Sequence, residues 1–156
     1  MNTYANRRTI VVADDDADDC ALLHDAFAAA QIDSRFEFVS DGRKLLEYLR
    51  GAVAGGVADR RLDGDPAIVL LDLNMPSMNG REALAAIRAD PSLRHLPVVV
   101  FSTSRQDSDI LGSYQAGANS YIIKPTSFTE LTRIARELGA YWLGTVSLPT
   151  GPRSRR

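Results

Sequence analysis

The sequence predicts an α/β fold, a five-stranded parallel sheet with five helices on both faces. Short β-branched runs alternate with longer segments whose apolar residues recur every three or four positions, the periods of strands and helices. The run at residues 67–71 is almost entirely apolar, as expected for a strand buried on both faces of a parallel sheet. Parallel strands need crossover helices, and right-handed crossovers place those helices on both faces.

Composition narrows the class of protein. The chain has 156 residues, 45% of them hydrophobic and 24% charged, which is typical of one globular domain. The net charge of −2 gives no reason to expect nucleic acid or an anionic membrane as a partner. Cys20 has no second cysteine to pair with, and neither a signal peptide nor a membrane span is recognisable. A cytoplasmic location is therefore expected.

The first strand and helix account for only part of an aspartate cluster. A strand is predicted at residues 9–13 and a helix at about 17–30, with Asp16 as N-cap. Asp18 and Asp19 fall in the first turn, where acids favour the helix dipole. Asp14 and Asp15 precede the cap, and two more like charges there are unfavourable unless a cation binds.

The remaining elements follow the same alternation. Asp41 caps a helix that carries Leu45, Leu46 and Leu49, and residues 51–66 are predicted to be a long loop. Gly117 is expected to end the fourth helix as its C′ residue. The other strands are predicted at residues 36–40, 67–71, 97–101 and 119–123, and the other helices at 79–89, 107–116 and 127–142.

Polar residues stand at the carboxyl ends of four predicted strands. Asp14 and Asp15 end the first strand, and Asp72, Ser102 and Lys124 end the third, fourth and fifth. Each could be ordinary turn or cap chemistry, but ligands of parallel sheets collect at this edge. Lys124 is one of only two lysines among the 18 basic residues. The combination indicates a site with three acids, a hydroxyl and an ammonium group.

These residue types suit phosphoryl transfer. Three carboxylates at one place need a divalent cation, and all-oxygen ligands select a hard ion such as Mg²⁺. A carboxylate such as Asp72 can act as a nucleophile toward phosphorus. Lys124 and Ser102 would then stabilise the phosphoryl oxygens.

The ordered set of motifs resembles the receiver domain of two-component response regulators, which has a (βα)5 flavodoxin-like fold. The resemblance runs from Thr9 to about Trp142. It is carried by Asp14-Asp15, the stretch Leu71-Asp72-Leu73-Asn74-Met75-Pro76-Ser77-Met78-Asn79-Gly80, Ser102, Gly117-Ala118 and Tyr121-Ile122-Ile123-Lys124-Pro125.

The resemblance implies a role for each matching residue. Asp72 would be the phosphoryl acceptor, Asp15 a direct Mg²⁺ ligand, Asp14 a ligand through water and Asn74 a ligand through its backbone carbonyl. Lys124 would pair with the phosphoryl group.

It also implies a switch. Ser102 would move to hydrogen-bond the phosphoryl group and Tyr121 would turn inward in response. The Lys124–Pro125 bond would be cis, as in the family.

The resemblance also implies partners. A sensor histidine kinase would donate the phosphoryl group, and the protein would not be an enzyme beyond slow self-dephosphorylation. The long loop before the third strand and the ending at residues 141–149 resemble the regulators that partner bacterial phytochromes. The alternative class is a phosphatase or phosphotransferase of the haloacid dehalogenase type, but its Asp-x-Asp motif is not met, because Asn74 occupies the second position.

We expect a receiver domain at residues 1–143 and a C-terminal extension at 144–156, with no output domain, so that the protein acts through a downstream protein partner. Val146 and Leu148 alternate with polar residues, which predicts a short extended strand. It could fold back over its own domain or, as we expect, reach a second subunit in a twofold homodimer with Tyr141 and Trp142 as anchors.

Overall fold

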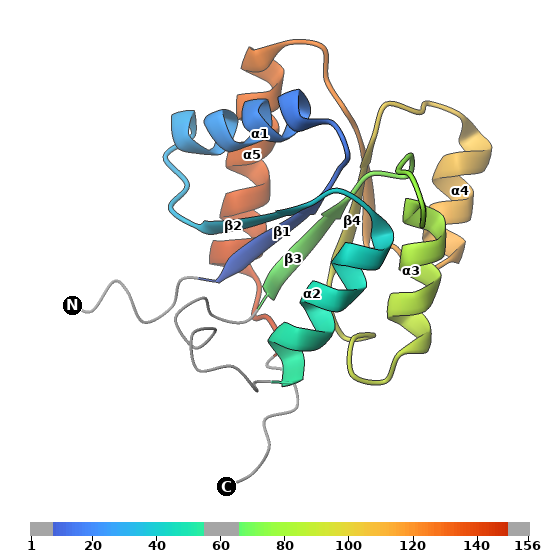
Figure 1. The fold of residues 1–156 in the computed structure, drawn as a ribbon. Coiled ribbons are helices and arrows are strands. Elements are labelled where there is room, and N and C mark those ends of the chain that lie inside the picture. The colour runs from blue at the N-terminus through green and yellow to red at the C-terminus, as the bar shows by residue number, and fades with distance from the viewer. Residues whose placement is uncertain (1–7, 55–65, 150–156) are drawn as a thin grey trace, which may run out of the picture.

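Five parallel strands form the centre of the protein. The computed structural model describes residues 8–54 and 66–149. The strands are β1 (Thr9–Ala13), β2 (Arg35–Val39), β3 (Pro66–Leu71), β4 (Val98–Ser102) and β5 (Ser120–Ile123). They pair in parallel in the order β2-β1-β3-β4-β5 (Figure 1). This is the flavodoxin-like order, so the predicted fold is confirmed.

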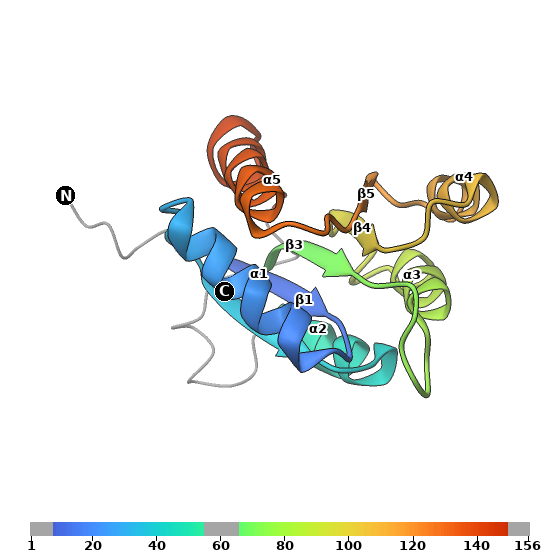
Figure 2. The same ribbon diagram turned by 90° about the horizontal axis from the view of Figure 1, so that it is seen from above.

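Helices cover both faces of the sheet. They are α1 (Ala17–Ala29), α2 (Gly42–Ala54), α3 (Gly80–Ala89), α4 (Asp107–Gln115) and α5 (Phe128–Ala140). Helices α1 and α5 pack together on one face, α2 and α3 pack together on the other, and α4 contacts β5 (Figure 2). Within the described ranges, no helix is long and apolar enough to cross a membrane.

The core has two layers because successive strand residues point to opposite faces. In β1, Ile10 and Val12 belong to the cluster that includes Leu23 and Phe27 of α1. Val11 and Ala13 belong instead to the cluster under α2 and α3. Strands β1, β3 and β4 are buried along their whole length, which is why their sequences lack polar alternation.

Predicted helix ends are confirmed by their caps. Asp16 accepts hydrogen bonds from the amides of Asp18 and Asp19, and Asp41 accepts one from the amide of Lys44 at 2.8 Å. After α4, Gly117 has φ +102° and its amide bonds the carbonyl of Tyr114 at 3.0 Å. A glycine relieves the strain of this left-handed conformation, as predicted for the C′ residue.

Some boundaries differ from the predictions. Helix α2 continues through Gly51 to Ala54, so the loop predicted to begin at residue 51 is wrong for its first four residues. Val53 packs against the core, and this apolar contact outweighs the low helix propensity of Gly51. The last residue of that predicted loop, Pro66, belongs to β3, and the part at residues 55–65 lies outside the described residues. Strand β2 lies one residue earlier than expected.

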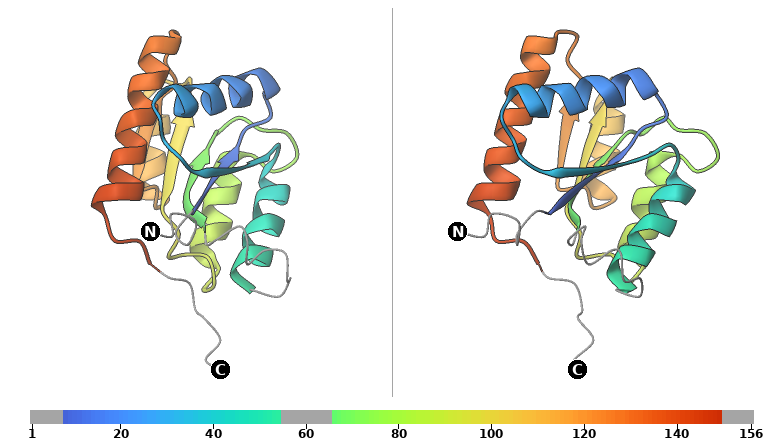
Figure 3. Two further views of the ribbon diagram at one scale, coloured as in Figure 1. Left: turned by 90° about the vertical axis from the view of Figure 1, so that its left-hand side faces the viewer. Right: turned by 60° about the vertical axis from the view of Figure 1, so that its left-hand side comes forward.

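Two predictions about the C-terminal part are wrong, namely the helix end at residue 142 and the strand after it, whereas the homodimer stays a prediction. A π-helical turn, Tyr141–Thr145, continues α5, and residues 146–149 form no strand. Val146 and Leu148 are half-buried and line a cavity with Arg8 and Ser34. The chain after α5 reaches the end of the sheet where the strands begin (Figure 3). The segment therefore folds back over its own domain, because its two apolar side chains find cover there.

The Lys124–Pro125 bond is also not the expected isomer. Within the described residues there is no cis peptide bond, so this bond is trans. Trans is the more stable isomer before proline by about 0.5–1 kcal/mol.

Candidate functional site

Backbone hydrogen bonds fix the strand-end residues at one edge of the sheet. The amide of Asp14 bonds the carbonyl of Val39 at 3.0 Å, and the amide of Asp72 bonds the carbonyl of Ala13 at 2.9 Å. The amide of Lys124 bonds the carbonyl of Ser102 at 2.8 Å. These bonds extend the parallel ladders past the strand ends, so the side chains start from a rigid base.

Three acids converge at this edge. Asp14 and Asp72 are buried, with 7% and 8% of their surface exposed, whereas Asp15 is exposed. One carboxylate oxygen from each of the three residues lies within 4.8 Å of the others. Opposite ligands of an octahedral Mg²⁺ are about 4.2 Å apart. A small rotation of the side chains would therefore let the three residues hold such an ion.

One oxygen of each buried carboxylate is fixed by a backbone amide. Asp14 Oδ1 accepts from the amide of Asp16 at 2.9 Å, and Asp72 Oδ1 accepts from the amide of Asn74 at 3.2 Å. The second oxygen of each, Oδ2, faces Lys124. The carboxylates are thus preorganised, and one oxygen of each is held by a cation that a metal ion could displace.

Lys124 bridges three carboxylates, two from the start of α1 and the turn before it and one from the end of β3. Its Nζ lies 2.7 Å from Asp14 Oδ2, 3.1 Å from Asp19 Oδ2 and 3.3 Å from Asp72 Oδ2. Burial alone would lower the pKa of Lys124, but the hydrogen bond to Asp14 and the charge of Asp72 outweigh it and raise the pKa. The ammonium form is therefore kept at neutral pH.

The pKa of Asp72 is raised. Burial is the largest cause, and the charge of Asp14 adds to it, while Lys124 and the amide of Asn74 act in the opposite direction. A site with more acids than cations leaves Asp72 incompletely compensated, which favours a further cation beside it.

The hydroxyl predicted at the site lies at the start of a hydrogen-bonded loop. Ser102 is fully buried and its Oγ accepts from the amide of Ser104 at 3.2 Å. The hydroxyl of half-buried Tyr121 donates to the carbonyl of Ser104 at 2.8 Å. Ser102 and Tyr121 are thus joined through Ser104.

The same loop is tied to two helices. Ser104 Oγ donates to Asp109 Oδ2 at 2.5 Å, and the other oxygen of Asp109 receives Arg81 Nη2 at 2.6 Å. Arg81 belongs to α3 and Asp109 to α4. A displacement of Ser104 would therefore change contacts made by both helices.

Gly80 makes room for the acceptor loop. A Cβ atom at this position would overlap the carbonyl oxygen of Asp72 and lie 2.8 Å from the Cα atom of Leu73. The loop returns to this point because the amide of Gly80 bonds the carbonyl of Leu73 at 3.1 Å. Any side chain here would displace Asp72.

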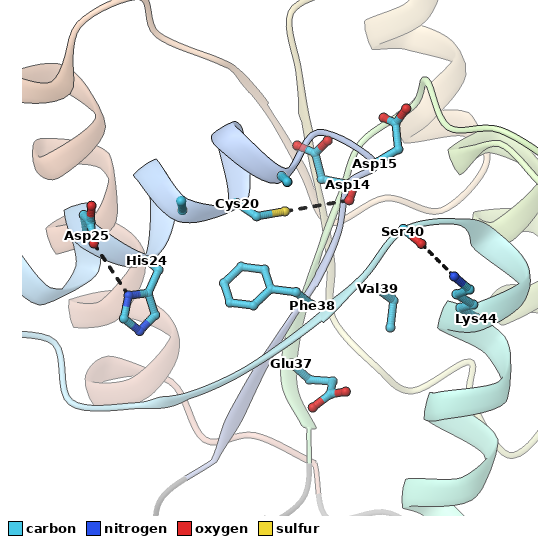
Figure 4. A pocket seen from close by; sticks show the side chains of 12 residues that line it. Asp14, Asp15, Cys20, His24, Asp25, Glu37, Phe38, Val39, Ser40 and Lys44 are labelled. Carbon is cyan, nitrogen blue, oxygen red and sulfur yellow. Dashed lines mark hydrogen bonds and ion pairs between the residues drawn. The ribbon is translucent and has the colours of Figure 1, made fainter.

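A cavity of about 690 Å³ borders the acids, between α1 and β2. It is lined by Asp14 and Asp15 at one end and by His24 and Phe38 further along (Figure 4). Cys20 points from α1 toward the carbonyl of Asp14. Burial and the charge of Asp14 raise the pKa of this thiol to about 11, so it is protonated and unreactive at neutral pH.

The structure thus brings Asp14, Asp15, Asp72 and Lys124 together as predicted. Sequence reasoning assigns Asp19 only to the helix dipole and misses its contact with Lys124, which lies 105 residues away. The ties made by Arg81 and Asp109 had no signal in the sequence.

Comparison with known proteins gives one consistent result. The family model of the response regulator receiver domain matches residues 10–136. The probable methanogenesis regulatory protein FilR2 of Methanothrix harundinacea (strain 6Ac) is 40% identical over 86% of this chain and 83% of its own.

Two solved structures superpose closely. The phosphorylated cyanobacterial phytochrome response regulator RcpA matches with a TM-score of 0.80 and 34% identity, over 93% of this chain and 100% of that one. The Mn²⁺-bound form of the response regulator Rcp1, a protein of Synechocystis, matches with a TM-score of 0.76 and 30% identity, over 92% and 99%.

Proposed function

The chain belongs to the family of response regulator receiver domains, and from this premise we propose that it accepts a phosphoryl group on Asp72 from a sensor histidine kinase, with Mg²⁺ as cofactor. The observation that carries the proposal is a buried carboxylate held between two further acids and an ammonium group at the carboxyl edge of the sheet. Few structural roles need this arrangement, and phosphoryl transfer uses all of it.

In the proposed reaction an oxygen of Asp72 forms a bond to phosphorus as the phosphorus–nitrogen bond of the kinase phosphohistidine breaks. The bonding electrons leave with the imidazole, which takes up a proton from the solvent. Asp14, Asp15, Asp72 and the carbonyl of Asn74 would hold Mg²⁺, which would supply neutralisation of the charge on the transferring group. Lys124 is already within 3.3 Å of Asp72 and would turn to the phosphoryl oxygens.

The switch would begin at Ser102. If its Oγ turns to the phosphoryl group, the amide of Ser104 loses its acceptor at 3.2 Å. The carbonyl of Ser104 holds the hydroxyl of Tyr121, so a movement of the loop changes the position of that ring. We propose this coupling as the route from phosphorylation to the surface around α4.

The phosphatase alternative is disfavoured by Asn74. Its side chain is an amide and cannot serve as the second carboxylate that a general acid or base requires. Its backbone amide is used to orient Asp72. We therefore propose a phosphoacceptor and not an enzyme that turns over a substrate.

We further propose a phytochrome-type kinase as the donor and a homodimer as the working form. RcpA is described as a phytochrome response regulator and shares 34% identity with this chain. For the dimer, Tyr141 is 51% exposed and stacks edge-on against Trp142 at 5.1 Å, which leaves an aromatic surface at the end of α5. Val146 and Leu148 of the extension lie against their own domain, so we propose that the extension has a secondary role in the dimer. Light scattering on the full chain and on one ending at Gly144 should then show similar dimers.

The acceptor is tested by intact mass. Incubation of the full chain with Mg²⁺ and a small phosphodonor should add one phosphoryl group, and Asp72→Asn should add none while unfolding cooperatively like the wild type. Asp18→Asn, which removes an exposed acid elsewhere in the cluster, is the matched control. Labelling of Asp72→Asn to the wild-type extent would refute the acceptor.

The division of labour is tested by Mg²⁺ titration. Asp15→Ala should lose most Mg²⁺ affinity, because it removes a charged ligand. Lys124→Ala and Ser102→Ala should not weaken it, because neither side chain is a ligand of the ion, but both should uncouple phosphorylation from the environment of Tyr121. A similar loss of Mg²⁺ affinity in all three variants would contradict the separate roles.

A further inference from the structure

Asp19 contacts the lysine of the site but does not belong to its metal group. Its Oδ2 lies 3.1 Å from Lys124 Nζ. The three acids whose oxygens converge within 4.8 Å are Asp14, Asp15 and Asp72, and Asp19 is not among them. The function proposed above gives tasks to those three acids and none to Asp19.

We infer that Asp19 is a positioning residue that holds Lys124 when a divalent cation takes Asp14 and Asp72. The inference rests on the proposed function, and it assigns to the first turn of α1 a direct influence on how tightly the cation binds.

The ammonium group of Lys124 has a carboxylate neighbour for each of its donors. Lys124 has three N–H donors and three carboxylate neighbours, on Asp14, Asp19 and Asp72. Two of those neighbours would give oxygens to the cation. Lys124 competes with the cation for them, and its own positive charge repels the cation.

The Lys124 side chain is confined by its surroundings. The backbone of Lys124 is fixed by the hydrogen bond that its amide donates to the carbonyl of Ser102. Its ammonium group lies 5.8 Å from the centre of the Phe101 ring. The Lys124 side chain is only 10% exposed, so it cannot escape into solvent without losing this cover. Asp19 is the remaining carboxylate within reach once Asp14 and Asp72 have turned to the cation.

The backbone of Asp19 is anchored by the N-cap of α1. The start of α1 is fixed by the Asp16 side chain, which accepts from the amides of Asp18 at 2.9 Å and Asp19 at 3.1 Å. The Asp19 side chain is 42% exposed, so its pair with Lys124 adds little to the stability of the fold. Its effect should instead appear in the competition between Lys124 and the cation.

The chain supplies a matched control. Asp18 lies beside Asp19 in the first turn of the same helix, carries the same charge and has the same relation to the helix dipole. Asp18 is exposed, and Lys124 bonds to Asp14, Asp19 and Asp72 instead. A general charge or dipole effect would change with either residue, whereas the positioning role belongs to Asp19 alone.

The experiment is calorimetric titration of the full chain with MgCl₂. Asp19→Asn should weaken Mg²⁺ binding about fivefold, because Lys124 then has only Asp14 and Asp72 to pair with and competes more strongly with the ion for them. Asp18→Asn should weaken it by less than about twofold, because an exposed charge is screened. Asp19→Glu should recover most of the affinity, and thermal unfolding should be similar for all variants.

A double-mutant cycle with Lys124→Ala gives the readout that a merely structural role would not move. Without Lys124 the competition is gone, so Asp19→Asn and Asp18→Asn should have the same small effect. Equal effects of the two substitutions in the presence of Lys124, or a full effect of Asp19→Asn in its absence, would overturn the inference.

The same preparations separate this inference from the proposed function. The wild type is also incubated with Mg²⁺ and a small phosphodonor, and its mass is recorded. A chain that shows the expected cycle but takes no phosphoryl group would refute the function and leave the role of Asp19 standing. A chain that binds no Mg²⁺ would refute both.

Discussion

Helices α1 and α4 both follow strands that end at the site, yet they are held in different ways. Helix α1 buries Leu23, Ala26 and Phe27 and packs against α5, and its N-cap makes two side-chain hydrogen bonds. Helix α4 buries only Ser113, and its N-cap residue, Gln106, makes no such bond. The half of the site with the acids thus adjoins a fixed helix, and the half with Ser102 adjoins a loosely held one.

The difference has a functional reading. Leu111 and Tyr114 of α4 are 58% and 48% exposed, so little apolar area opposes a shift of this helix. What holds its start is polar, chiefly Asp109 between Ser104 and Arg81. Polar contacts at the surface exchange readily for water, whereas buried apolar contacts do not. We expect local opening to be easier at α4 than at α1.

The largest expected effect on the free energy of unfolding comes from replacing one apolar side chain of each helix by alanine. Phe27→Ala should cost about 3–5 kcal/mol, because the ring is fully buried. Leu111→Ala, the matched change on α4, should cost less than about 0.5 kcal/mol. Urea unfolding of both variants measures the contrast, and equal costs would show that α4 is packed as firmly as α1.

The caps should give a smaller contrast. Asp16→Ala should destabilise the fold by about 0.5–2 kcal/mol, because two amides lose their acceptor. Gln106→Ser should instead add a cap to α4 and stabilise it. Thermal unfolding without divalent cations reports both. If Gln106→Ser also weakens the response of Tyr121 to phosphorylation, the looseness of α4 is needed for switching; an unchanged response would argue against that need.

Cutting the polar tie should have a smaller and more local effect. Ser104→Ala removes the hydrogen bond to Asp109 and should cost about 0.5–1.5 kcal/mol. Hydrogen exchange should accelerate across α4 and stay unchanged in α1. Ser108→Ala, at an exposed position of the same helix, serves as the control. Acceleration in both helices would mean that they open as one unit.

The smallest expected effect is the pH dependence of stability that arises from Asp72, in the half of the site beside α1. It is small because Lys124 already offsets part of the repulsion between Asp72 and Asp14. The pKa of Asp72 is raised above its ordinary 3.8, so the folded state holds the proton more tightly than the unfolded state. The associated stability is present below the ordinary pKa and is lost as pH rises through the raised one.

Asp72→Asn, which is neutral at every pH, should therefore be more stable than the wild type at pH 7 in the absence of divalent cations. The advantage should shrink as pH falls toward 3.8. Chemical unfolding at both ends of this range decides it, and a constant difference would mean that burial of Asp72 carries no electrostatic cost.

The sequence by itself determined the order of elements and the edge on which Asp14, Asp15, Asp72 and Lys124 meet. The central strand β3 is an uninterrupted apolar run, helices such as α1 start at a side-chain cap, and both signals are local. Because strands joined by crossover helices run parallel, their carboxyl ends all lie at one edge of the sheet. Those two facts suffice for the acid trio without any knowledge of packing.

Only the tertiary structure decided the rest, because it depends on contacts between residues far apart in the chain. Lys124 and Asp19 are 105 residues apart, and the side-chain rotamers that let them meet are set by the packing around them. Arg81 reaches Asp109 across 28 residues. Helix α2 continues to Ala54, and Val146 turns onto its own domain, because apolar side chains are buried against distant parts of the chain. Local helix and strand propensities carry no information about such contacts.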